Sequence, residues 1–204
     1  MQIIRKRQVS KIIAHLILIA VFLIGCDILT NGGNEPPPKN DLSTKDSLAV
    51  RAILDTNGLN NVKVRKVISL ANSRVGVISL DSVVLKKFIF TSSFDSLGGG
   101  TTLNIFNSQL DSIIILDTLN LQLTFQISNT TLRSIPNNIS MLKGPISFYL
   151  PNNKIQYISF EIMKCNVRYI DVQYNALCSV SDSLNSWIIA NSRNSSWRST
   201  QNCH

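Results

Sequence analysis

Apolar residues recur in the second half of the chain at a nearly constant interval. Phe125, Phe148 and Ile170 are 23 and 22 positions apart, and a step of 22 positions back from Phe125 reaches Leu103. A second apolar residue stands two positions after each of them. An apolar pair spaced in this way predicts a short strand that points two side chains inward. Segments that recur at this interval predict stacked units with one shared interior, because a single unit cannot bury its own apolar edge.

A polar residue stands five positions after the first apolar residue of each pair. In chain order these residues are Ser108, Thr130, Asn153 and Asn175. At the turn that follows a strand, such a side chain can bond to buried backbone groups, each of which would cost about 1–3 kcal/mol if left unpaired. Because two of the four positions carry hydroxyls instead of amides, we expect those two turns to be held less firmly.

This pattern resembles the leucine-rich repeat, L-x-x-L-x-L-x-x-N-x-L-x-x-I-P, and Ile135-Pro136 matches its end. From Leu103 onward the chain is similar to the leucine-rich-repeat domains of bacterial surface lipoproteins. The resemblance implies an α/β solenoid in residues 45–204. It would be a short right-handed superhelix with parallel strands on its concave face and helical caps at both ends. The alternative that the residues leave open is a β-sandwich of many short strands.

The resemblance is looser before Leu103. Val64-x-x-Val67 and Leu85-x-x-Phe88-x-Phe90 look like degenerate repeats. The step from Phe88 to Leu103 is only 15 positions and contains three consecutive glycines. We therefore expect one truncated or irregular unit there.

The resemblance also assigns the ends of the domain, with residues 45–60 as the N-terminal cap, 61–177 as the repeats and 178–204 as the C-terminal cap. Apolar residues within Asp46 to Leu54 have helical spacing. After Ser181, a plausible helix N-cap, a second helical face contains Val180, Leu184, Trp187 and Ile188. We expect Trp187 to cover the last unit. As in repeat proteins whose cap is closed by a disulfide, Cys178 and Cys203 are expected to pair, which an oxidising compartment would permit.

The first 25 residues have the features of a secretory leader. A basic start is followed by thirteen residues, Ile12 to Ile24, that are apolar except for His15. This run is shorter than the roughly 17–25 residues of a membrane-spanning helix and suits the apolar part of a signal peptide. Leu23-Ile24-Gly25-Cys26 resembles a lipobox, which predicts cleavage before Cys26 and acylation of that residue. The alternatives are an ordinary secretory signal and a buried core segment.

Residues 26–44 are rich in Asn, Gly and Pro and predict a disordered tether between the lipid and the domain. Together with the leader, they indicate a protein of the bacterial cell envelope that is anchored to a membrane. We expect the outer membrane or the cell surface in preference to the inner membrane.

Net charge argues against nucleic acid as a partner. The formal charge is +8, but four of the 20 basic residues lie in the leader, so the chain from Cys26 onward carries 16 basic and 12 acidic groups. A charge of +4 is too weak for that function. Five basic residues of the first third could form a local basic patch or could simply lie on solvated faces. They are Lys63, Arg65, Lys66, Lys86 and Lys87.

The chain has few residues suited to catalysis. Its two histidines are His15, in the leader, and His204, the last residue, so a serine or cysteine nucleophile has no sensible base. After the leader the only glutamates are Glu35 and Glu161, and no carboxylate pair stands in a recognisable motif. The cysteines lack metal-site spacing, and Cys165 at a repeat leucine position predicts a buried, inert thiol. We therefore expect no enzyme, metal or cofactor, although a polysaccharide-acting enzyme remains an alternative.

The resemblance implies that the concave face binds a protein or a glycan. The outward strand positions that we select as ligand-binding candidates are Asn104, Phe106, Gln126, Tyr149, Tyr169, Asp171 and Gln173. Tyr149 and Tyr169 should be neighbours on adjacent strands, where paired aromatic rings offer flat amphipathic area for a partner. Alternatively, the two tyrosines merely pack against each other. The same face could also serve a structural subunit of an envelope complex that has one fixed partner.

Overall fold

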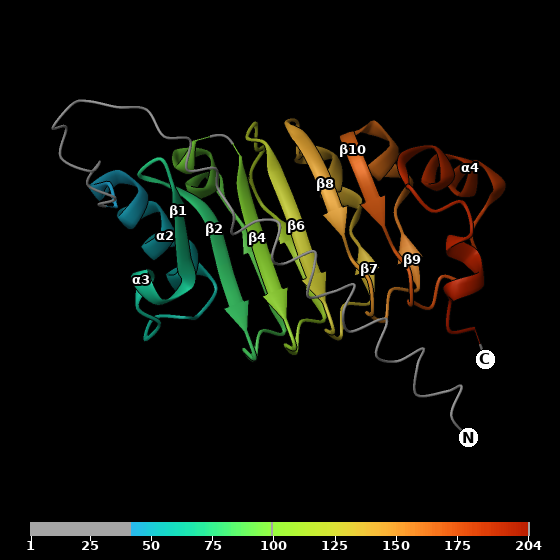
Figure 1. The fold of residues 1–204 in the computed structure, drawn as a ribbon, viewed down its shortest axis with the longest axis horizontal. Helices are drawn as coiled ribbons and strands as arrows, with labels where there is room; N and C mark the ends of the chain where they lie inside the picture. The colour runs from blue at the N-terminus through green and yellow to red at the C-terminus, as the bar shows by residue number, and fades with distance from the viewer. Residues whose placement is uncertain (1–41, 99, 204) are drawn as a thin grey trace, which may run out of the picture. The chain divides into compact units, whose positions relative to one another are not determined.

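The structure, a computed structural model, describes residues 42–98 and 100–203. They form an α/β protein with a six-stranded, mostly parallel sheet and few helices (Figure 1). The predicted signal peptide, Cys26 and the tether as far as residue 41 lie outside the described residues. Within the described part of the chain, no helix is long and apolar enough to cross a membrane.

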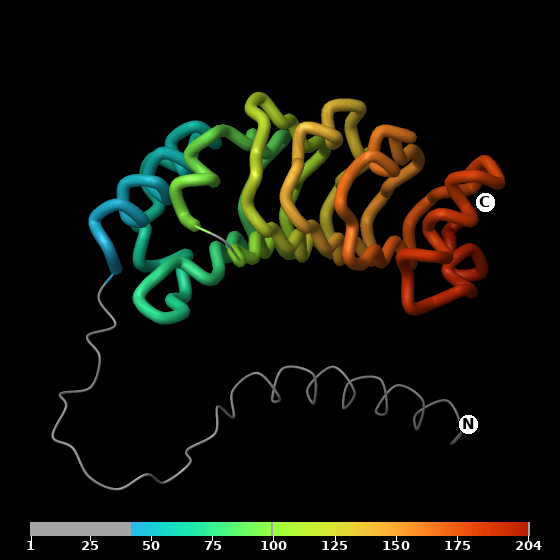
Figure 2. The backbone as a smooth tube through the Cα atoms, turned by 90° about the horizontal axis from the view of Figure 1, so that it is seen from above, coloured from blue at the N-terminus to red at the C-terminus, as the bar shows by residue number. Residues whose placement is uncertain are grey.

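The main sheet contains six strands. In spatial order they are β1 (Ile68–Ala71), β2 (Arg74–Asp81), β4 (Thr101–Phe106), β6 (Leu123–Ser128), β8 (Pro145–Tyr149) and β10 (Asn166–Asp171). The segments between these strands contain two small sheets, β3 (Lys87–Phe90) with β5 (Ser112–Ile115) and β7 (Ser134–Ile135) with β9 (Tyr157–Ile158). They also contain the 3₁₀ helices η1 (Ser92–Leu97), η2 (Asn137–Met141) and η3 (Phe160–Lys164). Figure 2 shows the main strands side by side along one side and the return segments along the other.

The four repeated apolar residues lie in one row across the sheet. Leu103 is opposite Phe125, Phe125 is opposite Phe148, and Phe148 is opposite Ile170. Each is at most 1% exposed. The Phe125 and Phe148 rings stack with centroids 5.0 Å apart. The prediction of parallel strands with aligned inward residues is confirmed, and the β-sandwich alternative is wrong, because only β1 and β2 pair antiparallel in the main sheet.

The unit before Leu103 is irregular, as expected, but it is longer than the later ones and not truncated. The strand that precedes β4 is β2, where Ile78 lies opposite Leu103, so the step between them is 25 positions. Phe88 and Phe90 are buried, but they lie on β3, which pairs with β5 in the opposite layer. Their alternation correctly indicates a strand. It carries no information about which sheet the strand joins, because both layers face the same interior.

The segment Val64–Val67 is also not a repeat. It forms one helical turn, α3, and leads into β1, which turns back on β2 as an antiparallel hairpin. Asn72 and Ser73 make the turn with φ values of 51° and 62°. Such left-handed backbone matches the twist of a tight hairpin. The spacing of three between Val64 and Val67 reflects the helical turn α3 that precedes this hairpin.

The polar residues at the turns are buried as predicted. Asn153 donates to the carbonyl oxygens of Ile127 and Leu150 and accepts from the backbone N–H of Thr130. Asn175 donates to the carbonyl oxygen of Leu150, at 2.8 Å, and to that of Val172. Each amide thus joins its own turn to the preceding strand, which removes the cost of unpaired backbone groups.

The segment predicted as the N-terminal cap forms the helix α2 (Thr44–Thr56), and Ser43 is its N-cap residue. The Ser43 hydroxyl accepts from the backbone N–H of Asp46. Asp46 is fully buried, and its carboxylate accepts from the guanidinium of Arg74 at 2.9 Å and from the backbone N–H of Val75. Burial raises the pKa of Asp46, but the bonds from Arg74 and Val75 outweigh it and leave the pKa below its ordinary value. This ion pair joins α2 to the first long strand of the sheet.

The C-terminal cap consists of α4 (Asp182–Asn191) and the 3₁₀ helix η4 (Trp197–Thr200). As expected, Ser181 caps α4 by accepting from the backbone N–H of Leu184. Trp187 packs against the core as predicted but is only partly buried, whereas Trp197, which the sequence pattern did not single out, is 1% exposed. Trp197 stands on a short second helix that brings it back over the interior, so its burial depends on that chain reversal.

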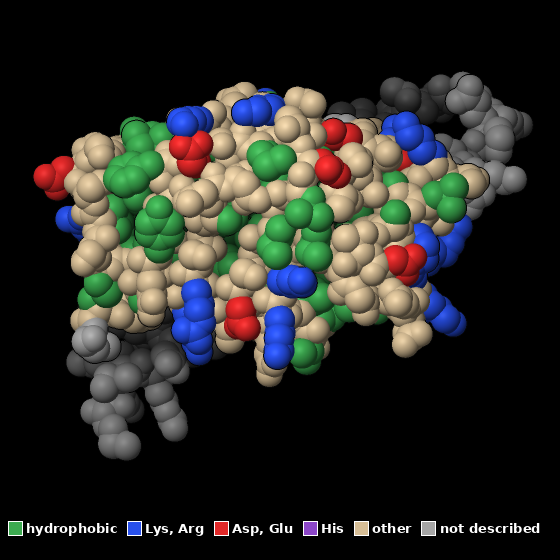
Figure 3. All heavy atoms as spheres, turned by 180° about the vertical axis from the view of Figure 1, so that it is seen from behind, with side chains coloured by type: hydrophobic (Ala, Val, Ile, Leu, Met, Phe, Trp, Pro, Cys, Tyr) green, Lys and Arg blue, Asp and Glu red, His purple; other side chains and the backbone are tan. Residues whose placement is uncertain are grey.

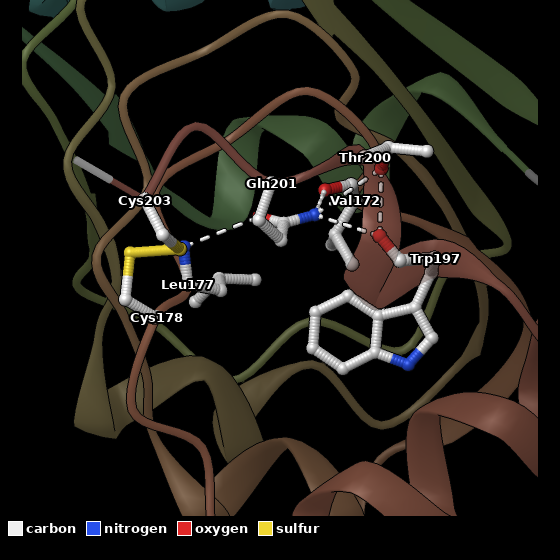
Figure 4. The surroundings of a disulfide bond; sticks show 7 residues. All are labelled: Val172, Leu177, Cys178, Trp197, Thr200, Gln201 and Cys203. Carbon is white, nitrogen blue, oxygen red and sulfur yellow. Dashed lines mark hydrogen bonds between the residues drawn. A yellow bond between two sulfur atoms is a disulfide. The ribbon is translucent and has the colours of Figure 1, made fainter.

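The predicted disulfide between Cys178 and Cys203 is present, with Cα atoms 5.5 Å apart (Figure 4). Beside it, the Gln201 side chain accepts from the backbone N–H of Leu177 and donates to the carbonyl oxygens of Val172 and Trp197. One amide and one disulfide therefore hold the C-terminal segment against the end of the sheet.

Candidate functional site

The outward side chains of β2, β4, β6, β8 and β10 form one surface, which we call the sheet face. The strand register arranges them in rows that cross the sheet. One row contains Ser79, Asn104, Gln126, Tyr149 and Asp171, and the next contains Val77, Thr102, Thr124, Ser147 and Tyr169. On β4, β6 and β8 these positions alternate with buried residues, as the two-residue period of a strand requires. On β10 a register shift between Val167 and Tyr169 interrupts the alternation.

The structure brings together most of the candidate residues chosen from the sequence. Asn104, Gln126, Tyr149 and Asp171 share one row. The others are Phe106, opposite Ser128 at the carboxyl end of its strand, Tyr169 in the adjacent row, and Gln173, two positions beyond the end of β10. None of the seven is classed among the buried residues, so all of them have some access to solvent.

Tyr149 and Tyr169 are in contact, as expected, with ring centroids 4.7 Å apart and ring planes at 39°. They are diagonal neighbours, because Tyr149 lies opposite Asp171 and Tyr169 lies opposite Ser147. Tyr149 is 38% exposed, so packing against its neighbour does not remove it from solvent. Burial, followed by the nearby Asp171 carboxylate, raises the pKa of Tyr169, and its hydroxyl therefore stays protonated at neutral pH.

Arg193 is the residue of this site that the sequence pattern did not reveal. It follows α4, and its guanidinium carbon lies 5.7 Å from the centroid of the Tyr169 ring. At this distance a cation is attracted by the negative face of an aromatic ring. The C-terminal cap therefore adds a positive charge beside the tyrosine pair, and no local motif around Arg193 signals that contact.

The middle of the sheet face is polar and uncharged. The side chains of Thr102, Thr124 and Gln126 there are neutral, and the side-chain oxygen of Asn104 is buried without a hydrogen-bond partner among the described residues. Carboxylates lie near two corners of the surface, at Asp81 and Asp171. Such a surface can offer hydrogen bonds from hydroxyls and amides and an aromatic platform, but it has little charge with which to attract a strongly charged ligand.

A second polar ladder runs along the turns at the carboxyl ends of the strands. The Asn107 amide donates to Asp81, and the Asn129 amide donates to the side-chain oxygen of Asn107 at 3.3 Å. Asn107, Asn129 and Asn152 all have φ between 49° and 56°, the left-handed region that asparagine tolerates well. The asparagine that precedes three of the four buried turn residues is the sequence signal for this ladder.

The described residues offer little for catalysis or metal binding. Residues 42–98 and 100–203 contain no histidine, and no group of three metal-ligating side chains is found within these ranges. Cys165 is partly buried, and its burial raises the pKa of the thiol to about 11. The thiolate is therefore scarce at neutral pH, which agrees with the expectation of an unreactive cysteine.

The face opposite the main sheet contains scattered hydrophobic side chains between charged and polar ones (Figure 3). Tyr157 on β9 and Phe160 and Met163 on η3 are exposed there, between 39% and 52%. They alternate with buried residues that complete the second layer, and they do not include any of the candidate positions.

Comparisons with profiles of known protein families, with curated proteins and with solved structures gave no match. Function therefore has to be inferred from the residues of the chain itself.

Proposed function

We propose that this chain is a membrane-anchored leucine-rich-repeat lipoprotein whose sheet face binds a protein or a glycan of the bacterial cell envelope. The solenoid interpretation is supported by strands that recur in parallel register, by the buried Asn153 and Asn175 turns, and by a cap at each end of the row. In such an arrangement each unit buries its apolar edge against the next.

One observation carries the binding proposal. The exposed Tyr149 and the partly buried Tyr169 are in contact on an otherwise polar part of the sheet, beside the Arg193 guanidinium and the Asp171 carboxylate. Tyrosines bury large area at little entropic cost and add a hydroxyl that can bond to a partner, so they are enriched where proteins recognise ligands. The neutral hydroxyls and amides around them suit sugar hydroxyls or the polar rim of a protein surface.

The test of ligand binding replaces both tyrosines with alanine. Any protein recovered by pull-down from envelope extract, or any glycan recovered from an array, should bind the double variant at least tenfold more weakly, as expected when two aromatic anchors of about 1 kcal/mol each are lost. Tyr157→Ala is the matched control, because Tyr157 is 52% exposed but lies on β9 in the opposite layer. Equal affinity of the double variant and the control would remove the sheet face from consideration.

The membrane anchor has an independent test. The proposal requires that Cys26, in the lipobox-like sequence, become Nα- and S-acylated after cleavage of the leader. Cys26→Ser should then abolish incorporation of labelled palmitate and move the protein out of the membrane fraction, since two or three acyl chains are what give stable anchoring. Undiminished labelling of the serine variant would contradict the assignment of the anchor to this residue.

A further inference from the structure

The N-terminal end of the domain carries an excess of basic charge. Residues 42–98 contain eight basic and four acidic groups. Two of those acids are already paired, Asp46 with Arg74 and Asp55 with Arg51. The remaining positive charge is therefore not neutralised locally.

Three of the basic residues stand within a single turn of helix. Lys63 caps α3, Arg65 and Lys66 lie within it, and all three are exposed. Among the residues that the structure describes, none of the three takes part in an ion pair. Their charges are consequently available to an external anion.

The segment before α3 is held firmly against α2. The Arg51 guanidinium donates to the carbonyl oxygens of Val62, at 2.7 Å, and of Leu59, at 2.9 Å. Leu48, three positions before Arg51, is 66% exposed, and Lys45, three positions earlier again, is also exposed. Residues three apart on a helix lie on the same side. Lys45, Leu48 and Arg51 therefore follow one another along the surface of α2, and Arg51 contacts the segment that leads into α3.

The chain from the proposed anchor enters the domain at this same end. Cys26 is sixteen positions before Leu42, where the described structure begins. At roughly 3.3 Å per residue this segment reaches at most about 53 Å. In Figure 1, α2 and α3 lie together at one end of the sheet and α4 lies at the other.

We propose that Lys45, Leu48, Lys63, Arg65 and Lys66, named here the α2–α3 surface, dock on the anionic phospholipid headgroups of the bilayer that carries the anchor. Lipid phosphates attract basic side chains close to the membrane surface, and an exposed leucine can enter the interface between headgroups and acyl chains. The inference rests on the proposed lipid anchor, because a weak electrostatic contact gains from a tether that keeps its partner near.

The consequence is an orientation. The sheet runs from β1 and β2 at the docked end to β8 and β10 at the far end. Tyr149 and Tyr169 stand on those last two strands. Docking through the α2–α3 surface would hold the tyrosine pair away from the bilayer, where a ligand can reach it.

The experiment uses the chain from residue 26 onward with Cys26→Ser, so that binding to vesicles cannot come from acylation. This chain contains all the described residues, whose buried hydrophobic core extends from Ala49 to Trp197. It is sedimented with vesicles of phosphatidylcholine that contain about 30% phosphatidylglycerol or none. We expect it to partition onto the anionic vesicles alone and to be released at about 0.5 M NaCl, where charges are screened within a few ångströms.

The decisive variant is K63Q/R65Q/K66Q. At about fivefold per basic residue, it should lower the partition coefficient on the order of 100-fold. The matched control removes three exposed basic residues of the middle of the chain, R133Q/K143Q/K154Q, and should lower it only a few-fold. An equal loss in both variants, or no loss in either, would overturn the proposal. So would binding to soluble heparin without binding to anionic vesicles, which would indicate a polyanion other than the bilayer. The acylation assay measures palmitate incorporation and membrane fractionation in cells, and the pull-down assay uses the tyrosine variants, so failure of either is distinguishable from failure of the vesicle experiment.

Discussion

Asn153→Ala should be among the most destabilising single substitutions in this protein, although Asn153 is a polar residue at a turn. Its side chain is 6% exposed. The amide nitrogen donates to the carbonyl oxygen of Ile127 at 2.7 Å, and the amide oxygen accepts from the backbone N–H of Thr130 at 2.9 Å. Both partners belong to the preceding strand and its turn, so this one side chain bonds two adjacent units.

The magnitude follows from the groups that alanine would leave unpaired. Two buried backbone groups, the Ile127 carbonyl and the Thr130 N–H, lose their partner, at about 1–3 kcal/mol each. We therefore expect the free energy of unfolding to fall by about 4 kcal/mol. For a domain of this size, about 2–4 °C per kcal/mol converts that loss into a decrease in Tm of about 8–16 °C.

The assay is thermal and urea unfolding followed by circular dichroism, with Asn152→Ala as the matched control. Asn152 is the neighbouring asparagine, but it is exposed, and its left-handed φ of 56° costs alanine only about 1 kcal/mol. Ser108→Ala provides the second comparison. The Ser108 hydroxyl accepts from the backbone N–H of Val83 and donates within its own turn, to Phe106, so its loss should cost about 1–2 kcal/mol. Equal destabilisation by the two asparagine substitutions would refute the idea that the buried amide ladder holds the units together.

Substitutions at Asp46 and Gly144 and reduction of the disulfide test other parts of the fold. Asp46→Ala should cost about 2 kcal/mol in urea unfolding, because the buried backbone N–H of Val75 loses its acceptor and the half-exposed Arg74 guanidinium loses its ion-pair partner. The folded pKa of Asp46 is lowered, so its stabilising effect is complete above the ordinary pKa of about 4 and is lost as the pH falls below it. Asp46→Asn should accordingly unfold with a shallower dependence on pH below about 4 than the unsubstituted chain. Gly144→Ala should cost at least about 2 kcal/mol, since the added methyl would collide with the carbonyl oxygen of Leu121; an unchanged urea midpoint would contradict that contact. Reduction of the Cys178–Cys203 bond, which closes a loop of 25 residues, should cost about 3.5 kcal/mol, whereas a redox-independent Tm would show that the Gln201 contacts hold the cap alone.

For the main-sheet strands from Leu103 onward, the sequence alone predicts which side chains point into the core and which point outward. Alternation of apolar and polar residues decides which side chains point inward, and it alone predicts that Asn104, Gln126, Tyr149 and Tyr169 point outward. The buried polar turns are predictable for a similar reason. Asparagine and threonine at a fixed distance from a strand can bond to buried backbone groups of the turn, which would otherwise be unpaired. Both inferences depend only on the chemistry of residues close together in the chain.

What the sequence alone did not determine depends on contacts between distant residues. Phe88-x-Phe90 and Val75 to Leu80 have equally apolar patterns, and only the closed structure assigns the first to the return layer and the second to the main sheet. Arg74 meets Asp46, 28 positions away, and Arg193 meets Tyr169. Trp197 packs over the interior in addition to Trp187 and is the more deeply buried of the two. Periodicity is a local property of the order of residues along the chain. The pairing of one segment with another depends on how the whole chain packs, and it cannot be inferred from either segment alone.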